Sequence, residues 1–515
     1  MSRRYSEKLI IMSSNQNTSP STSTMRKHYG TDSTKECNLS SNFYKNLSSD
    51  TIVNNMTIHK VYPDHSEKTA LYPDKQFEKS AGFASIKLYK RRFLMLFVFM
   101  LCSMMNGVPQ YQYTVVADII SCYYGVSLND VNWASVVYMV AFLPLVFPVM
   151  YLMDTKGLRI TLVLGGVLNF LGSVVQCYTL SPDRYVYVMV CQTIYAMGQV
   201  FVLSLPPFIA GVWFGANEVG LACAMGVFGN QLGIAIGFIF TPLALTNDCN
   251  NTSSITEGLG CMAYPQVIVN IIILFIIVFV FEEKPKLYPS IAQATKHREG
   301  PEYGASLKRL FRNGPFVLLL IAYGLITGAY FAMSTILNEM VLIHFPGDEV
   351  DAGRMGAIMV FAGMIGSVLL GIFLDRTHKY KEISVLVFTV SFLLMLGYTF
   401  LIKLEHIWIQ YVFLSFLGLF MTGYLPAGFD FGAEITYPEP EAMSGSLLNA
   451  STQIFSILFT HAASSLLQNY NDFYSNILFS SSLLLGLIII VCMKCNLRRT
   501  NAAFDELKPR SKSLE

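Results

Sequence analysis

The sequence predicts an all-α polytopic membrane protein with twelve transmembrane helices in two pseudo-symmetric six-helix halves. Twelve long apolar segments lie between residues 93 and 495 and hold almost no acid or base. A helix that crosses a bilayer needs about 20 apolar residues, and the chain is 53% hydrophobic but only 14% charged. A basic loop at 282–314 separates the segments six and six. This architecture favours passage of a solute, and the net charge of +2 argues against a nucleic-acid partner.

The chain divides into five parts. Residues 1–90 are rich in Ser, Thr, Asn and Lys and have no apolar run long enough for a core, so we expect a disordered cytoplasmic tail. The N-terminal half is 91–281, the cytoplasmic central loop 282–314, the C-terminal half 315–495 and a second cytoplasmic tail 496–515. The expected helices are 93–117, 133–153, 158–180, 185–206, 218–245, 263–281, 315–340, 352–374, 383–402, 406–429, 442–468 and 474–495.

Charge in the loops sets the predicted orientation. Alternate loops hold most of the Lys and Arg, among them Arg91, Arg92, Lys156, Arg159, Lys284, Arg309, Arg376, Lys379 and Lys494. The remaining loops are poor in Lys and Arg and carry acids such as Asp118 and Asp348. Because basic loops stay in the cytoplasm, both termini are predicted to be cytoplasmic. We expect a multi-pass protein of the plasma membrane, with an intracellular membrane as the alternative.

The loop 246–262 faces outward in this orientation. It contains overlapping sequons at Asn250 and Asn251, which are candidate N-glycosylation sites. The alternative is that they are unused, because the loop is short and close to the membrane. Cys249 and Cys261 bracket the sequons, and a disulfide between them is expected if the loop faces an oxidising compartment.

The sequences of the two halves resemble each other when one half is shifted by about 220 residues. The turn Asp154–Arg159 after the second helix corresponds to Asp375-Arg376 after the eighth. Leu205-Pro206 corresponds to Leu425-Pro426, and Gly229-Asn230-Gln231 to Leu448-Asn449-Ala450. Three echoes at one offset indicate an internal duplication.

Six plus six helices, a basic central loop and an acidic-then-basic turn resemble the major facilitator superfamily, whose halves rock about a midplane site. Asp154, Gly157 and Arg159 fit the later part of its Gly-x-x-x-Asp-x-x-Gly-Arg loop motif, and Asp375 and Arg376 match in part. The leading Gly of the motif is absent. The resemblance implies that these charges latch the cytoplasmic faces together when the protein opens outward; the alternative is a plain determinant of topology.

The predicted helices hold few ionisable side chains but many amides and aromatic rings. Intramembrane acids mark ion-coupled transporters; here only His461 lies mid-membrane, so the sequence favours a uniporter. A haem-ligand or proton role for His461 is the alternative to a locally satisfied side chain. The first helix breaks at Pro109, next to Gln110 and Tyr111. Aromatic faces attract cations, so aromatics and amides without acids suit an ammonium that carries a hydroxyl; the alternative is packing and interhelical bonding.

Several stretches resemble the feline leukaemia virus subgroup C receptor family of this superfamily. They include Leu143–Pro148, Asp154–Arg159, Val212–Gly215, Gly229–Gly233, Phe281–Pro285, Met421–Pro426, Glu434–Glu439 and Leu447–Ser451. The resemblance covers about 90–500 and leaves out the N-terminal tail. It implies facilitative transport of choline or ethanolamine by alternating access, or transport of haem.

The family's choline site implies the substrate-binding residues. Its glutamines on helices four and eleven correspond to Gln199 and Gln453, and its helix-seven aromatic corresponds to Phe331, with Tyr330 beside it. The helix-one Trp of the family corresponds to Gln110 here, with Tyr111 adjacent. An amide in place of Trp removes a cation–π partner worth roughly 0.5–2 kcal/mol. This substitution predicts weaker choline binding or a preference for ethanolamine.

Three functions are therefore weighed. A uniporter for choline or ethanolamine is favoured, and its partners are a small organic cation and the lipid bilayer. A haem exporter or importer is the alternative, although the interior offers no Lys or Arg for the propionates. A receptor acting through its tails is the third. No nucleophile–base pair, metal cluster or phosphate loop occurs at workable spacing, so we expect no enzyme, no cofactor and no metal, and a monomer.

Overall fold

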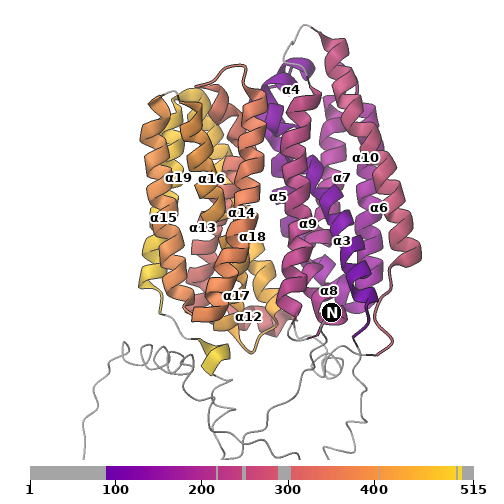
Figure 1. Cartoon of the computed structure of the whole chain (residues 1–515), viewed down its shortest axis with the longest axis vertical. Helices are drawn as coiled ribbons and strands as arrows, with labels where there is room; N and C mark the ends of the chain where they lie inside the picture. The colour runs from indigo at the N-terminus through magenta and orange to yellow at the C-terminus, as the bar shows by residue number, and fades with distance from the viewer. Residues whose placement is uncertain are drawn as a thin grey trace, which may run out of the picture. The chain divides into compact units, whose positions relative to one another are not determined.

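The computed structural model describes residues 88–215, 218–245, 251–287, 303–404, 406–494 and 497–501. These residues are helical, and no strand occurs among them. Figure 1 shows two groups of helices, α3–α10 from the N-terminal half and α13–α19 from the C-terminal half. The expected six-plus-six helical architecture is confirmed. The predicted N-terminal tail lies outside the described residues apart from 88–90.

The N-terminal half follows the predicted order with two interrupted helices. Its helices are α3 (Arg91–Gly107), α4 (Ala117–Tyr124), α5 (Leu128–Lys156), α6 (Leu158–Gln176), α7 (Tyr185–Leu203), α8 (Pro206–Trp213), α9 (Val219–Ala244) and α10 (Thr252–Val280). The first span continues past its expected end at residue 117 as α4, and the fourth continues past its expected end at residue 206 as α8. Helix α10 begins well before the expected residue 263, because the Asn251 side chain caps it by accepting a hydrogen bond from the Ser254 N–H (3.1 Å).

The C-terminal half has the same plan. Its helices are α13 (Gly314–Leu342), α14 (Glu349–Thr377), α15 (Tyr380–Leu401), α16 (Ile407–Met421), α17 (Tyr424–Thr436), α18 (Glu441–Asn469) and α19 (Asp472–Cys492). The tenth predicted helix divides into α16 and α17, just as the fourth divides into α7 and α8. The predicted central loop contains an amphipathic helix that the sequence analysis missed, α12 (Tyr303–Arg312).

Helix α18 differs from the other spans in its polarity. Eleven segments of the described chain are long and apolar enough to cross a membrane, and α18 is not among them. One side of α18 buries hydroxyl groups, which lower its hydropathy, and several of them are bonded inside the bundle. The Ser451 hydroxyl donates to the Leu320 carbonyl (2.7 Å), and the Thr452 hydroxyl bonds that of Thr327 (2.7 Å). Since α18 packs on α13, α5 and α19, it is the twelfth helix of the predicted arrangement.

A row of glycines brings α9 and α3 into backbone contact. Gly229, Gly233 and Gly237 follow one another at four-residue spacing, and a Cβ on each would meet the backbone of α3. At Gly229 that Cβ would lie 2.7 Å from the Met100 carbonyl oxygen. Small residues allow such close approach between membrane helices, where packing rather than burial from water drives association. The row holds the broken first helix in place along its length.

Candidate substrate site

The first helix is broken at its middle, and the freed backbone groups are bonded by neighbouring helices. After α3 the chain forms short 3₁₀ turns at Val108–Gln110 and Thr114–Val116 before α4 begins. The Gln192 amide of α7 donates to the Pro109 carbonyl (3.1 Å), and the Ser135 hydroxyl of α5 donates to the Gln110 carbonyl (2.7 Å). The predicted break at Pro109 is confirmed, and Gln192 is explained as a structural residue of it.

The break places two predicted site residues against each other. The Gln199 amide on α7 donates to the Gln110 side-chain oxygen over 2.7 Å, and both side chains are largely buried. This single hydrogen bond uses one amide N–H and one carbonyl of the pair. For the Gln199 carbonyl and the Gln110 NH₂ the structure gives no second hydrogen bond of normal geometry among the described residues, and the Gln110 side chain also lies beside the Tyr111 hydroxyl. The pair therefore offers one acceptor and one donor to a small polar solute.

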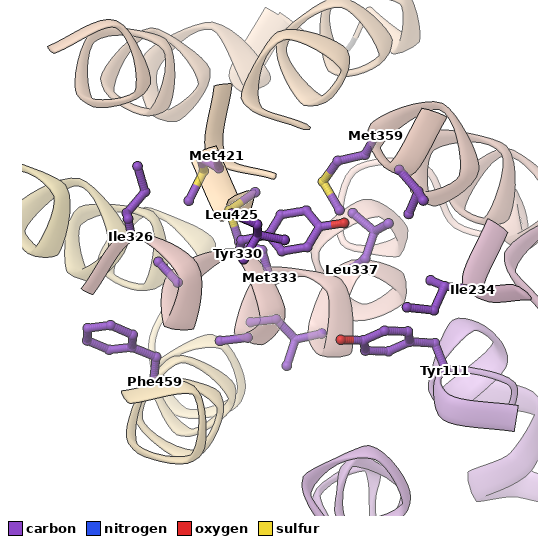
Figure 2. Close-up of a cluster of buried hydrophobic side chains, with 14 of the residues drawn as sticks. Tyr111, Ile234, Ile326, Tyr330, Met333, Leu337, Met359, Met421, Leu425 and Phe459 are labelled. Atoms are coloured by element: carbon purple, nitrogen blue, oxygen red, sulfur yellow. The ribbon is translucent and has the colours of Figure 1, made fainter. Parts of the chain in front are cut away.

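Two tyrosines approach the same interior from opposite halves. Tyr111, next to Gln110, stacks on Phe238 of α9 with ring centroids 5.3 Å apart, and its hydroxyl has no partner of normal geometry among the described residues. Tyr330 on α13 packs edge-on against Phe331 (5.3 Å). Figure 2 shows Tyr111 and Tyr330 in one cluster, with methionines and leucines around them. Their ring faces and hydroxyls are the aromatic surfaces that the sequence predicted for a cation.

Gln453 and Phe331 form no hydrogen bond or ring contact with the amide pair in the described structure. Phe331 is half-buried and packs against the edge of the cluster. Gln453 is half-buried on α18, near the midpoint of that helix, and forms no hydrogen bond with another described residue. The structure thus brings Gln110, Gln199 and Tyr111 together, and it leaves the roles of Gln453 and Phe331 as predictions.

Figure 1 shows α4 at one end of the helix bundle, which we call the α4 end, and α8, α12 and α17 at the opposite end, which we call the α12 end. Hydrogen bonds join the two halves at the α4 end. The Asn132 amide of α5 donates to Glu339 of α13 (2.6 Å) and to the Ser464 hydroxyl of α18 (3.2 Å). The Asn338 amide donates to the Val115 carbonyl (3.0 Å). These contacts close the path between the halves at the α4 end.

Glu339 is a candidate functional residue that sequence reasoning missed. It lies inside a predicted helix, and its carboxyl also accepts a hydrogen bond from Gln468 of α18 (3.4 Å). Only 7% of the residue is exposed. A buried carboxyl held by amides of both halves changes its surroundings when the halves separate. The sequence feature that could have identified Glu339 is an acidic residue close to the end of an apolar segment.

Among the predicted latch residues, Arg159 makes its contacts within its own half. The Arg159 side chain donates to a carbonyl of α10 (2.6 Å), and its backbone N–H donates to Glu283 (2.8 Å). Asp154 lies on the exposed last turn of α5, and Arg376 is exposed in the last turn of α14. The Asp375 side chain lies outside the described residues. A latch between the halves remains a prediction for the state that opens at the α4 end.

His461 has an aromatic neighbour rather than a ligand set. Its ring centroid lies 4.9 Å from that of Trp133 on α5, and the two rings are tilted by 53°. Within the part of the chain that the structure describes, no three His, Cys, Asp or Glu residues are grouped as a metal site. This ring contact between the two halves explains why a histidine occurs in the membrane-spanning region.

The predicted disulfide between Cys249 and Cys261 is wrong. Cys261 is a free, exposed thiol on α10, because that helix extends through the expected loop. Cys122 on α4 is disulfide-bonded instead. Cys249 and Asn250 lie outside the described residues, and Asn251, whose side chain caps α10, remains a predicted glycosylation site.

Comparison with known proteins identifies relatives along most of the chain. The model of the Major Facilitator Superfamily matches residues 93–460. Choline/ethanolamine transporter FLVCR1 of Felis catus is 43% identical over 447 residues, which cover 85% of this chain and 80% of that protein. Choline/ethanolamine transporter FLVCR2 of Homo sapiens is 42% identical over 433 residues, covering 84% and 82%.

Solved structures agree on the fold. A D-xylose-proton symporter superposes with a TM-score of 0.62 at 14% identity, covering 79% of this chain and 98% of the other. The transporter FucP in its outward conformation superposes with a TM-score of 0.59, also at 14% identity, covering 79% and 100%. Family match, relatives and fold agree: the chain is a membrane transporter, not an enzyme, and belongs to the feline leukaemia virus subgroup C receptor family of the major facilitator superfamily.

Proposed function

We propose that this protein is a facilitative carrier of small hydroxyl-bearing ammonium compounds, ethanolamine and choline, and that ethanolamine is the better substrate. The observation that carries the proposal is the Gln110–Gln199 amide pair at the broken first helix, beside Tyr111. The relatives at 40% identity and above that bear the name choline/ethanolamine transporter support the substrate class.

The chemistry of the pair favours a primary ammonium. The remaining amide carbonyl accepts a hydrogen bond from an ammonium N–H, and the remaining NH₂ donates to the substrate hydroxyl. Choline has no N–H to donate, so its trimethylammonium depends on aromatic faces, here those of Tyr111 and Tyr330. Gln453 and Phe331 complete the site from the C-terminal half after the halves move.

Transport then follows from rocking of the two halves. With the basic loops in the cytoplasm, the α4 end faces outward, and the Asn132–Glu339 contact is the outer gate in its closed state. Release of that contact, with the Asp154, Arg159, Asp375 and Arg376 turns closing the cytoplasmic side, gives the outward-open state. Downhill exchange between these states needs no coupling ion, and a monomer in the plasma membrane suffices for it.

Uptake of radiolabelled ethanolamine and choline tests the proposal in cells that express the protein. Gln199→Ala and Gln453→Ala should each abolish saturable uptake at unchanged surface abundance. Gln410→Ala is the matched control, since Gln410 is a buried amide on α16 outside the proposed site. Full uptake by both site variants would remove Gln199 and Gln453 from the site, whereas no amine uptake by wild type at the surface would reject the amine carrier. Haem efflux lost in His461→Ala would then favour the haem alternative.

A further inference from the structure

A cavity at the α12 end lies away from the amide pair. It has a volume of about 570 Å³ and is lined by α12, by the turn that joins α17 to α18, and by the C-terminal segment. A cavity of this size accommodates a small organic molecule rather than a single ion. Its polar side chains are Arg309, Arg312, Arg498, Asn313 and Glu439.

The cavity has a surplus of positive charge. Glu439 pairs with Arg309, whose hydrogen bonds hold the pKa of that carboxyl below its usual value, so Glu439 is ionised at neutral pH. Ser306 bonds the same carboxylate. In the described part of the chain, Arg312 and Arg498 make no ion pair, although both line the cavity. Two guanidinium groups without a protein anion favour an anionic ligand with several oxygen acceptors.

The framework of the cavity is built from neighbouring parts of the chain. Asn313 donates to the Ile435 carbonyl (3.0 Å), which joins α12 to the end of α17. The backbone N–H of Thr500 donates to Glu434 (2.7 Å), and Arg499 pairs with Glu441 (3.0 Å), so the segment that carries Arg498 is fixed beside α17 and α18. These bonds hold Arg312 and Arg498 at one cavity, although they are far apart in sequence.

The position of α12 suits a membrane surface. The helix is amphipathic, with Leu310 buried against the protein and Phe311 54% exposed next to Arg312. An exposed aromatic ring beside arginines, on a short helix just before a transmembrane helix, is typical of a segment in the interfacial layer. A phosphate-bearing headgroup in that layer would be level with the cavity.

We propose that this cavity binds a phosphate-ester anion, with Arg312 and Arg498 as its principal ligands, while Arg309 remains paired with Glu439. The ligand chemistry is shared by the headgroup of an anionic phospholipid and by a soluble phosphorylated metabolite. Occupancy links α12, the α17–α18 turn and the C-terminal segment. The proposal does not depend on which solute the protein carries.

Binding to the purified full-length protein tests it directly. The probe is a fluorescent, water-soluble dioctanoyl phosphatidylinositol bisphosphate, titrated by anisotropy. Arg312→Gln/Arg498→Gln should weaken binding at least tenfold. The matched control is Lys308→Gln/Lys494→Gln, which removes two positive charges from exposed side chains that do not line the cavity, one on α12 and one just after α19; it should stay within threefold of wild type.

Competition separates the two sources of the ligand. Displacement of the probe by free inositol trisphosphate at similar concentration identifies a soluble phosphoester, whereas displacement only by unlabelled lipid identifies a headgroup in the membrane. Equal affinity in the double variant and wild type, or an equal loss in the control, would overturn the proposal. If the double variant is not monodisperse, the single variants Arg312→Gln and Arg498→Gln are measured, each with an expected loss of about threefold or more.

Discussion

Substitution of Gln110 by Trp tests the proposed selectivity most directly. In the structure this side chain accepts a hydrogen bond from Gln199 and keeps an NH₂ group free for the substrate. Tryptophan removes that donor and places the best cation–π partner at the helix break. We therefore expect Gln110→Trp to weaken ethanolamine and to shift the ratio of the two affinities toward choline.

The magnitude follows from two terms. Loss of a substrate hydrogen bond costs about 1 kcal/mol, and one added cation–π contact contributes about 1 kcal/mol to a quaternary ammonium. Both substrates carry the hydroxyl, so the first term cancels in the ratio of their affinities. The cation–π term shifts that ratio toward choline by about 1 kcal/mol, which corresponds to ~5-fold. The Gln199 amide loses its acceptor in the variant, but that cost applies to both substrates and cancels in the ratio.

The assay is competition between unlabelled choline and ethanolamine for uptake of one radiolabelled amine. Gln110→Leu is the control, because it removes the amide without adding a π-face. It should lower the affinities for ethanolamine and choline alike, each about fivefold, and leave their ratio unchanged. An unchanged selectivity ratio in Gln110→Trp, or the same ratio in the Trp and Leu variants, would refute a role of this position in choosing the ammonium.

Three further predictions concern the gate, the packing and the orientation. Asn132→Leu removes two hydrogen bonds across the α4 end. Double electron–electron resonance between spin labels on α5 and α13 at that end should then show a long-distance population that is larger by about tenfold. An unchanged distance distribution would contradict the gate. Gly233→Ala brings a Cβ against the Met104 carbonyl and should lower the Tm by several degrees for a cost of ~1–3 kcal/mol, whereas Gly371→Ala, which faces open space, should not; equal Tm values would contradict the close α3–α9 contact. A membrane-impermeant maleimide added to intact cells should label Cys261 on α10 and not Cys261→Ser; equal labelling of both would contradict the predicted orientation.

The fold was predictable because bilayer physics leaves few choices to an apolar chain. Segments near 20 apolar residues must be helices, and the six-plus-six order followed from the basic loop at 282–314. What the sequence did not predict was set by local caps and pairings. Asn251 extends α10 through an expected loop, and this extension leaves Cys261 on a helix rather than in a disulfide. Helix α12 lies in a charged loop, so the length of apolar segments, which identified the transmembrane helices, could not identify it.

The site was predictable in part. Residues next to Pro109 were identified because a proline in a membrane helix frees backbone groups, and the structure shows Gln192 and Ser135 bonding them. The Gln110–Gln199 pair could not be deduced from the sequence, since it depends on how α3 and α7 pack. Glu339 was missed because it lies next to the end of the expected helix 315–340, and only the folded structure shows Asn132 and Gln468 around its carboxyl.

The amide pair and the gate, which carry the proposed function, require different kinds of contact between helices. The amide pair requires the first helix to be broken at a fixed point, and the glycine row of α9 holds that helix by backbone contact on the α3 side of the break. The gate requires α5 and α13 to separate, and it uses polar side chains that water can replace. Rigid apolar contact within a half and exchangeable hydrogen bonds between halves are what a rocking mechanism needs, because each half then moves as a unit while the contacts that break cost little. If that division holds, gate substitutions such as Asn132→Leu will shift the balance of states with little effect on thermal stability, and substitutions such as Gly233→Ala will do the reverse.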